Sequence, residues 1–453
     1  MGKPFYKKGF PIYSSKKGVS MSPRRLAFDV LKKMRASGQY SNIAVDRALS
    51  SSELGESDRG LFTAIVMGVV ERRITLDFFI DRLAAEPSKI DADTRTLLRI
   101  GLYQLMFLDR IPEYAAINET VDLAPRRTKG FVNAILRSYL RKKGKIDLPD
   151  KDADAVLHLS VKYSFPKELC ERFLSLFGFE RAGEIFDSYN KTPPMTLRVN
   201  TLKISREDYA KLLDKAEIKY ELTKNSPHGI NVFGMSYAAL PGTEEGLFFV
   251  QDEASQICVE AAGVEVGDNV IDCCSCPGSK SFGMAINMQN TGKMLSCDLH
   301  KSKLSLVSSG AERLGIDIIS TREADARKFD PSLEQSADVL LCDAPCSGFG
   351  VVAKKPEIRY KDLSESDKLP QIQSDILENV SKYVKVGGVL LYSTCTVFPE
   401  ENCGVISKFL ESHSEFVAED FCVGQIQSEG GKLSLYPDIH KTDGFFIAKL
   451  RRI

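Results

Sequence analysis

From Val264 onwards, short apolar runs alternate with longer segments of helical periodicity. Apolar runs of about four to eight residues bounded by Gly, Pro or Asp are typical of buried strands. Strands that alternate with helices predict a parallel sheet with helices on both faces. We therefore expect a Rossmann-like α/β domain over residues 263–453, with strands at 269–274, 293–298, 316–321, 339–343, 388–395 and 444–450.

Residues 22–145 differ, because helical periodicity continues through the whole segment. Between Arg95 and Leu108 the apolar positions are too dense for a surface helix, so we expect this helix at the centre of a bundle. The segment predicts an all-α domain and contains no catalytic constellation. Residues 1–21 are basic and rich in Gly, Ser and Lys, which favours a flexible tail.

Residues 152–262 mix the two patterns. His158–Tyr189 is helical, with a helix start at Pro166, and Pro193-Pro194 ends the segment. An amphipathic helix is expected at 206–216, and short strands are expected at 195–200, 218–222, 229–233 and 247–250. This segment predicts a small α+β domain.

The composition, with 43% apolar and 27% charged residues, is that of an ordinary soluble protein. No run of about 18 apolar residues occurs, and the first residues lack the apolar core of a signal peptide. We therefore expect a cytoplasmic protein that does not enter a membrane. The formal net charge is zero, so any surface that binds nucleic acid has to be local.

The chain has 11 cysteines, and all but Cys170 lie after position 257. In a chain of this size without a secretion signal, reduced thiols are expected. Cys273, Cys274 and Cys276 cluster, but no histidine stands at ligand spacing nearby, so we expect no metal.

Two of the predicted strands end on a cysteine-containing loop. The run at 339–343 stops at Asp343-Ala-Pro-Cys346-Ser-Gly, and the run at 388–395 ends in Ser393-Thr-Cys395-Thr. Ligands of open α/β sheets bind at the carboxyl ends of the strands, so both thiols are expected to face one crevice. A lone cysteine is more often a small buried hydrophobe, but the pairing of two such loops favours chemistry.

These two motifs, followed by Pro399-Glu-Glu-Asn402, resemble those of the RNA 5-methylcytosine methyltransferases of the NOL1/NOP2/Sun family. The segments 98–104 and 131–137 resemble the NusB-type RNA-binding domain that accompanies the catalytic domain in bacterial 16S rRNA enzymes of this family. The segments 197–200 and 250–256 resemble the markers of its RRM-like domain. The resemblance implies a multidomain protein with a NusB-like all-α bundle, a small RRM-like α+β subdomain and a class I methyltransferase domain.

The same resemblance implies a substrate and partners. The expected substrate is a cytosine in 16S rRNA, either free or in a small-subunit assembly intermediate, and no obligate protein partner is evident. A tRNA substrate is the alternative within the enzyme class. A non-catalytic RNA-binding assembly factor is the alternative outside it.

Methylation of cytosine carbon 5 needs covalent activation, because that carbon is a poor nucleophile. A thiolate that adds to carbon 6 makes carbon 5 able to attack the methyl donor. The resemblance assigns the nucleophile to Cys395, assistance in product release to Cys346, and a hydrogen bond with the pyrimidine edge to Asp343. Cys346 is the alternative nucleophile, because a Pro-Cys motif has that role in DNA cytosine enzymes.

The first strand of the α/β domain ends in Asp272-Cys-Cys-Ser-Cys-Pro-Gly-Ser-Lys280, which is not the fingerprint of dinucleotide binding. Gly278 lacks a Cβ and allows close approach of a ligand. By resemblance, S-adenosylmethionine is bound by the loop residues together with three acids at or after strand ends: Cys274, Ser275, Cys276, Pro277, Gly278, Ser279, Lys280, Asp298, Asp325 and Asp343.

The loop departs from the usual family pattern, Cys-Ala-Ala-Pro-Gly-Gly-Lys, at Ser275, Cys276 and Ser279. If position 279 required a positive φ, its serine would cost roughly 1 kcal/mol or more. Near the end of the chain, the segment 436–446 also matches the family and predicts the final hairpin. His440 is interpreted there as a turn residue, with a catalytic base as the alternative.

Overall fold

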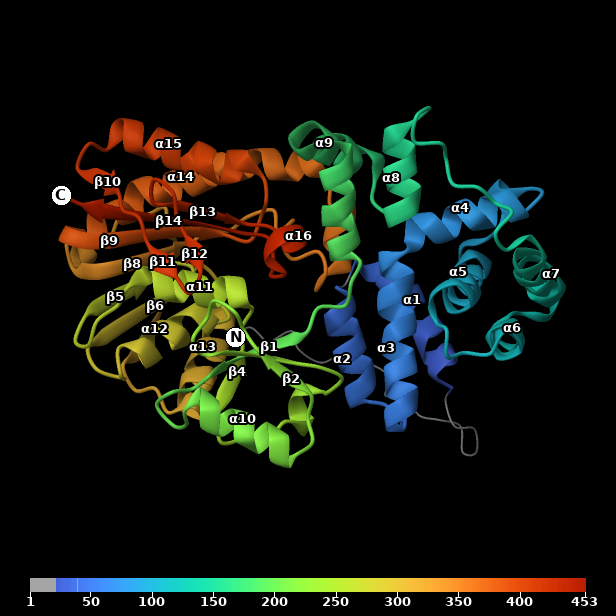
Figure 1. Cartoon of the computed structure of the whole chain (residues 1–453), viewed down its shortest axis with the longest axis horizontal. Helices are drawn as coiled ribbons and strands as arrows, with labels where there is room; N and C mark the ends of the chain where they lie inside the picture. The colour runs from blue at the N-terminus through green and yellow to red at the C-terminus, as the bar shows by residue number, and fades with distance from the viewer. Residues whose placement is uncertain (1–21, 39) are drawn as a thin grey trace, which may run out of the picture. The chain divides into compact units, whose positions relative to one another are not determined.

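The computed structural model describes residues 22–38 and 40–453 (Figure 1), so the tail expected over residues 1–21 lies outside the described residues. Contacts between residues divide the chain into two compact units. The first, here called the helical unit, contains the described residues up to Asn190 together with Lys355–Lys361. The second, here called the α/β unit, contains Lys191–Lys354 and Asp362–Ile453.

The helical unit is an all-α bundle, as expected for residues 22–145, and it also contains the helical part of the segment 152–262. Its α-helices are α1 (Pro23–Ser37), α2 (Ser41–Ser50), α3 (Glu56–Glu71), α4 (Arg73–Leu83), α5 (Ala92–Phe107), α6 (Glu113–Leu123), α7 (Arg126–Lys142), α8 (Ala155–Tyr163) and α9 (Lys167–Tyr189). Helix α5 contacts α1, α3, α4, α6 and α7, and its residues Leu97, Leu98 and Leu102 are fully buried. The expectation of a central helix in this place is therefore confirmed.

A segment distant in sequence completes the helical unit. The short 3-10 helix η4 (Pro356–Tyr360) follows the Cys346 loop along the chain, but its contacts are with the bundle. The guanidinium of Arg359 is buried and donates to the carbonyl oxygens of Glu71 (2.8 Å) and Ser164 (3.3 Å) and to Asn190 Oδ1 (3.0 Å). It also lies over the ring of Phe165, 4.2 Å from the ring centroid.

Arg359→Met is expected to lower the free energy of unfolding of the helical unit by roughly 3 kcal/mol, because several buried acceptors lose their donor together. Denaturant titration followed by far-UV circular dichroism measures this loss. Arg47→Met is the matched control, because Arg47 is exposed on α2. Equal midpoints for the two variants would contradict the anchoring role of Arg359.

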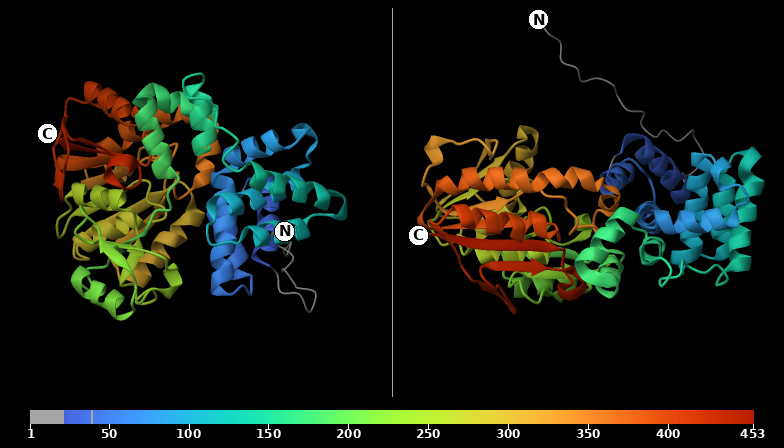
Figure 2. Two further views of the ribbon diagram at one scale, coloured as in Figure 1. Left: turned by 45° about the vertical axis from the view of Figure 1, so that its right-hand side comes forward. Right: turned by 90° about the horizontal axis from the view of Figure 1, so that it is seen from above.

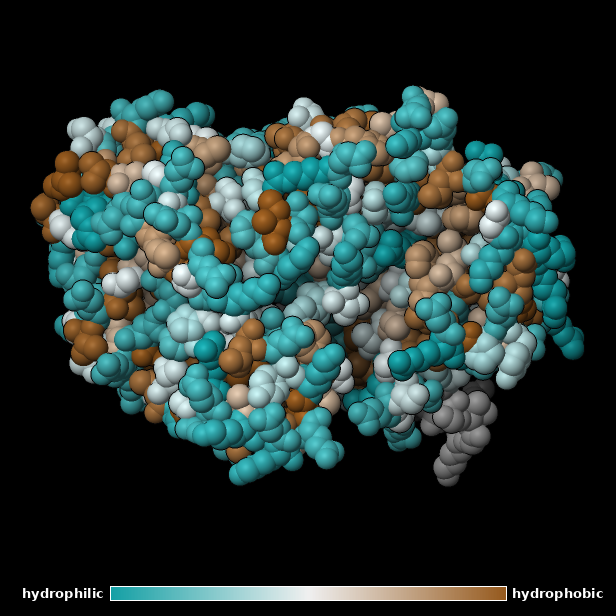
Figure 3. All heavy atoms as spheres, viewed as in Figure 1, coloured by the Kyte–Doolittle hydropathy of each residue, from teal (hydrophilic) through white to brown (hydrophobic). Residues whose placement is uncertain are grey.

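The α/β unit begins with a small antiparallel sheet. Its strands β1 (Met195–Val199), β2 (Tyr220–Leu222), β3 (Gly229–Val232) and β4 (Phe248–Val250) lie in the order β2-β3-β1-β4. Helix α10 (Arg206–Lys215) packs Tyr209 and Leu213 into the same hydrophobic cluster as β1 and β3. Its outward surface is hydrophilic (Figure 3). The predicted α+β arrangement is confirmed.

The main sheet of the unit is mixed. Its strands are β5 (Asn269–Asp272), β6 (Lys293–Asp298), β7 (Ile319–Glu323), β8 (Ala337–Asp343), β9 (Val384–Thr394), β10 (Phe416–Ala418), β13 (Lys432–Leu435) and β14 (Phe445–Arg452). The order is β10-β14-β9-β8-β5-β6-β7, and β13 also pairs with β14. The strands from β9 to β7 are parallel, whereas β14 is antiparallel to β9 and to β13.

One strand starts later than the sequence pattern predicts. The run at 316–321 was expected to be extended throughout, but β7 begins at Ile319. Helix α13 (Lys301–Leu314) ends at Gly315, which has a φ of 73°, and the Ile316 N–H donates to the Ala311 carbonyl oxygen at 2.9 Å. Ile316 is therefore part of the helix end, where this hydrogen bond satisfies a terminal carbonyl.

Side chains of β8 alternate between two cores. Val339 and Leu341 pack in the cluster formed with α11 (Glu253–Ala262), α12 (Ser279–Asn287) and α13. Leu340 and Cys342 pack in the cluster formed with α14 (Leu369–Val380) and α15 (Cys403–Ser412). Helices thus cover both faces of the sheet, and α14 and α15 run side by side on one of them (Figure 2). Because both faces are covered, the polar residues of the site are confined to the carboxyl edge.

Candidate functional site

The two cysteine loops leave the sheet side by side. Strands β8 and β9 are parallel neighbours, and Asp343 lies opposite Ser393 in their register. Cys346 follows the end of β8, and Cys395 follows the end of β9. The Sγ atoms of Cys346 and Cys395 are 3.2 Å apart, and both residues are partly buried. The structure thus brings the two predicted catalytic thiols into direct contact.

The surroundings of the two thiols make them unequal. The hydrogen bond from Cys346 lowers the pKa of Cys395, and the positive charge of Lys280 acts in the same direction. The pKa of Cys346 is raised well above the ordinary thiol value by its hydrogen bond to Cys395, by burial and by negative charge at Cys395 and Glu401. Cys395 is therefore the thiol that ionises more readily. Because the thiolate is the nucleophilic form, this asymmetry favours attack by Cys395.

Asp343 is held from both sides at the edge of the sheet. Its Oδ2 atom accepts a hydrogen bond from Lys280 Nζ at 2.6 Å, and its Oδ1 atom accepts one from Ser393 Oγ at 2.7 Å. Lys280 is on the first turn of α12. This residue, expected as part of the cofactor loop, thus links that loop to Asp343 and places a positive charge near the thiols.

The loop between β5 and α12 requires glycine at position 278 and not at position 279. Gly278 has a φ of 112°, and a Cβ at this residue would lie 2.6 Å from the ring of Phe282. Ser279 is the first residue of α12 and is not among the residues with positive φ. The cost that a positive φ would impose on a serine therefore does not arise at Ser279, because the helix has already begun there.

A buried acid stabilises the loop between β5 and α12. Asp272, the last residue of β5, accepts a hydrogen bond from Ser281 Oγ at 2.6 Å. Burial raises the pKa of Asp272 to about 7. Its contact with α12 indicates a structural role beneath the loop.

The other two predicted acids lie along the same edge of the sheet. Asp298 ends β6, and its Oδ1 atom accepts a hydrogen bond from the N–H of His300 at 2.8 Å. Asp325 follows β7 and pairs with Arg327 at 2.9 Å. Asp325 also lines a cavity of about 350 Å³ together with Cys273. The loop, Asp298, Asp325 and Asp343 thus form a row of polar groups that can hold a ligand along the edge.

Three polar residues of the site were missed at the level of the sequence: Ser393, Gln373 and Glu401. Ser393 supports Asp343, whereas Gln373 and Glu401 are fully buried behind the thiol loops. Glu401 lies in the quoted motif at 399–402, which was a usable signal. Gln373 lies on α14, where the sequence offers no such motif.

His440 has a structural environment. It ends the short helix α16 (Pro437–His440), and its Nδ1 atom accepts a hydrogen bond from the N–H of Tyr436 at 2.9 Å. This bond stabilises the connection between β13 and β14. The interpretation as a turn residue fits this geometry.

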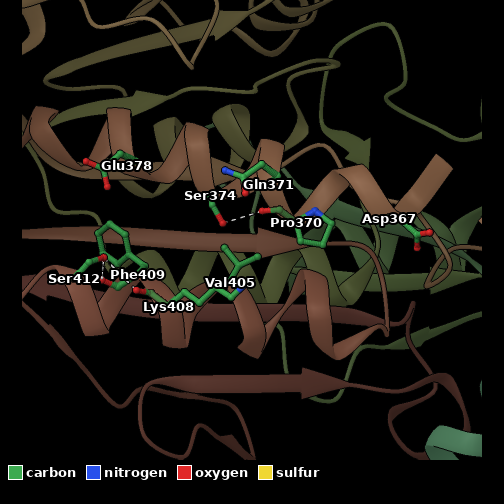
Figure 4. A pocket seen from close by; sticks show the side chains of 9 residues that line it. All are labelled: Asp367, Pro370, Gln371, Ser374, Glu378, Val405, Lys408, Phe409 and Ser412. Atoms are coloured by element: carbon green, nitrogen blue, oxygen red, sulfur yellow. Dashed lines mark hydrogen bonds between the residues drawn. The ribbon is translucent and has the colours of Figure 1, made fainter. Parts of the chain in front are cut away.

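A separate groove lies on the outer side of the sheet. It has a volume of about 790 Å³ and is formed by α14 and α15, with Ser374 and Lys408 among its lining residues (Figure 4). None of the predicted site residues, all of which the structure describes, lines this groove. The groove is therefore distinct from the thiol site.

The described part of the chain has neither a metal-binding cluster nor a membrane-spanning helix. Among residues 22–38 and 40–453, no three His, Cys, Asp or Glu side chains are grouped so that they could hold a metal ion. No helix in the same part of the chain is both long and apolar enough to span a membrane.

Comparisons with known families match three parts of the chain. The model described as 16S rRNA methyltransferase RsmB/F matches residues 262–451. The NusB family model matches residues 21–141, and a ferredoxin-like domain of RsmF/B-like methyltransferases matches residues 165–235. The expected organisation, with a NusB-like bundle, a small α+β subdomain and a Rossmann-like methyltransferase fold, is thereby confirmed.

Individual relatives cover nearly the whole chain. A protein of Bacillus subtilis strain 168 called "Probable ribosomal RNA small subunit methyltransferase B" is 35% identical over 445 residues, covering 95% of this chain and 99% of its own. The "Ribosomal RNA small subunit methyltransferase B" of Escherichia coli O7:K1 is 33% identical over 413 residues, covering 88% of this chain and 91% of its own. The crystal structure of NSun6 from Pyrococcus horikoshii with SFG has a TM-score of 0.58 and 25% identity, covering 64% of this chain and 99% of its own.

Proposed function

The chain belongs to the RsmB/F family of 16S rRNA methyltransferases, and from this premise we propose that it transfers a methyl group from S-adenosylmethionine to carbon 5 of a cytosine in 16S rRNA. The observation that carries the proposal is the contact of 3.2 Å between the Cys346 and Cys395 thiols. Cytosine carbon 5 chemistry needs one thiol to activate the ring and is helped by a second group that releases the product.

In this proposal Cys395 is the nucleophile. Its thiolate adds to carbon 6 of the cytosine, and carbon 5 then attacks the donor methyl group. The Asp343 carboxylate, held by Lys280 and Ser393, faces the pyrimidine edge and hydrogen-bonds it as the adduct forms. A cytosine inside an RNA duplex must first leave its stack to reach these groups.

Cys346 acts after methyl transfer. Carbon 5 then carries both the new methyl group and its original proton, and this proton must leave before the bond between carbon 6 and sulfur can break. Once the Cys395 sulfur is bonded to carbon 6, its negative charge no longer raises the pKa of Cys346, so Cys346 can lose its own proton to water and then accept the carbon 5 proton. The electron pair restores the ring double bond and expels Cys395 as a thiolate.

The methyl donor supplies an electrophilic methyl group, and the residues that would hold it fit such a ligand. Gly278 keeps the loop compact at the start of α12, where backbone N–H groups point outward. The side chains of Asp298 and Asp325 offer carboxylates for hydroxyl or amino groups, and residues 274–280 form the wall of the site. Asp343 lies at the end of this row of polar groups, next to the thiols.

The test is methylation of 16S rRNA and tRNA, both isolated from cells that lack the gene, followed by bisulfite sequencing. Wild-type protein with S-adenosylmethionine is expected to protect one 16S cytosine, and Cys395→Ala is expected to protect none. Protection of a tRNA cytosine alone would overturn the rRNA assignment. Absence of any new protected cytosine would favour a non-catalytic assembly factor.

Gly278→Ala is expected to weaken binding of S-adenosylmethionine by about tenfold or more, because the added Cβ displaces Phe282 and the start of α12. Isothermal titration calorimetry measures the change. Gly267→Ala is the matched control, because Gly267 also has a positive φ (96°) but no atom within 4 Å of its Cβ position. If both variants bound the donor like wild type, position 278 would have no part in its site.

A further inference from the structure

The dipeptide Glu401-Asn402 lies directly behind the two catalytic thiols. It spans the end of the short helix η7 (Pro399–Glu401) and the residue before α15, and both side chains are almost completely buried. A buried carboxylate needs partners that offset the loss of water. The partners of these two residues are the loops that carry the thiols.

Glu401 holds the Cys346 loop from both sides of the cysteine. Its Oε2 atom accepts a hydrogen bond from the N–H of Ser347 at 2.9 Å and one from Gln373 Nε2 at 3.0 Å. Gln373 Nε2 also donates to the carbonyl oxygen of Pro345 at 3.0 Å. The peptide groups before and after Cys346 are thus bound to one carboxylate, directly or through a single buried amide.

Asn402 holds the Cys395 loop in the same way. Its Oδ1 atom accepts a hydrogen bond from Thr394 Oγ1 at 2.5 Å, and its Nδ2 atom donates to the carbonyl oxygen of Thr396 at 3.0 Å. Thr394 and Thr396 are the residues directly before and after Cys395 in the chain. A third bond joins the loops to each other, between the Ser347 and Thr396 hydroxyl groups at 2.8 Å.

We propose that Glu401 and Asn402 form a clamp that sets the distance between the two catalytic thiols, with Glu401 as the positioning residue for Cys346 and Asn402 as the positioning residue for Cys395. The proposal rests on the proposed cytosine carbon 5 chemistry. It explains why adjacent residues of one motif bind the flanks of two cysteines that are 49 positions apart.

The clamp also contributes to the difference in pKa between the two thiols. Glu401 Oε1 is buried and has no hydrogen-bond partner among the described residues. The hydrogen bond with Cys395, burial and negative charge at Cys395 and Glu401 together raise the pKa of Cys346. The thiol of Cys346 therefore ionises less readily than that of Cys395.

Disulfide trapping of the full-length protein measures the distance between the thiols without any substrate. Diamide accepts the two electrons released when the thiols join, and peptide mass spectrometry quantifies the link between Cys346 and Cys395. Glu401→Ala and Asn402→Ala are expected to slow this link by about tenfold, since displaced loops rarely bring the sulfurs into bonding geometry. Glu400→Gln, an exposed neighbour on η7, is the matched control and is expected to match wild type.

Glu401→Gln separates position from charge, because its amide oxygen can still accept both hydrogen bonds. It is expected to keep the wild-type rate of linking but to move the alkylation of Cys346 by iodoacetamide to lower pH. In methylation assays, Glu401→Ala is expected to reduce kcat on the order of 100-fold with little change in KM for RNA. Thermal melting verifies that each variant is folded.

The outcomes distinguish the clamp from the proposed function. Wild-type linking rates in both alanine variants would overturn the clamp. If the alanine variants do not fold, Thr394→Val decides, because it removes only the hydroxyl that donates to Asn402 and is expected to slow the link; a wild-type linking rate in this variant would overturn the clamp. If wild-type protein methylates no cytosine while the linking results hold, the proposed function is wrong and the clamp stands.

Discussion

Cys395→Ala is expected to abolish methyl transfer, with a rate loss on the order of 10⁴-fold or more, because no covalent adduct can form. Cys346→Ala is expected to stop the reaction at a later point. Its RNA should remain attached to Cys395, because the carbon 5 proton has lost its acceptor. The two variants are thus expected to differ in the RNA adduct: Cys395→Ala forms none, and Cys346→Ala keeps a persistent one.

The measurement is denaturing gel electrophoresis of each variant after incubation with radiolabelled 16S rRNA and S-adenosylmethionine. Cys346→Ala should give a protein band that carries RNA, and Cys395→Ala should give none. Cys422→Ala is the control, since its thiol is exposed and distant in sequence from both loops. A persistent adduct in Cys395→Ala but not in Cys346→Ala would show that Cys346 is the nucleophile and that Cys395 assists product release.

Lys280→Met is expected to lower kcat/KM at pH 7 on the order of 100-fold, because the site loses the positive charge that stabilises both Asp343 and the Cys395 thiolate. The charge of Lys280 helps to lower the pKa of Cys395, so its removal raises that pKa. Activity depends on the thiolate and falls as pH drops through the pKa of Cys395. The acid limb of the pH profile should therefore move to higher pH in the variant.

A pH profile of single-turnover methylation tests this expectation, and raising the pH should restore part of the lost rate. Lys293→Met is the matched control, because Lys293 is exposed at the start of β6. An acid limb at the same pH in wild type and Lys280→Met would show that Lys280 does not act on the nucleophile.

The parallel strands and the two thiol loops could be predicted because each depends on local sequence. The end of each strand can be recognised where its apolar run stops, at Asp343 or at Cys395. Neighbouring parallel strands place such ends at the same edge of the sheet. The start of β7 was predicted too early, because Ile316 is apolar but satisfies the end of α13. Hydrophobicity alone does not show where a backbone N–H finds its acceptor.

The polar support of the site could be predicted only in part. Glu401 and Asn402 stand in a recognisable motif, but their partners lie on three other segments of the chain. Gln373 is on the buried side of α14, where polar residues among apolar ones have no distinguishing pattern. Whether Ser279 carries a cost could not be predicted for a related reason, since the position of positive φ depends on where α12 begins.

The segment Lys355–Lys361 has a consequence for how such proteins can be divided or recombined. The chain passes between the helical unit and the α/β unit after Asn190, after Lys354 and after Lys361. A fragment that starts at residue 191 would retain Arg359 and Tyr360 without the carbonyl groups that receive their hydrogen bonds. An exchange of helical units between relatives would therefore have to transfer the segment Lys355–Lys361 with the bundle, so the bundle and this segment are expected to evolve as a matched pair.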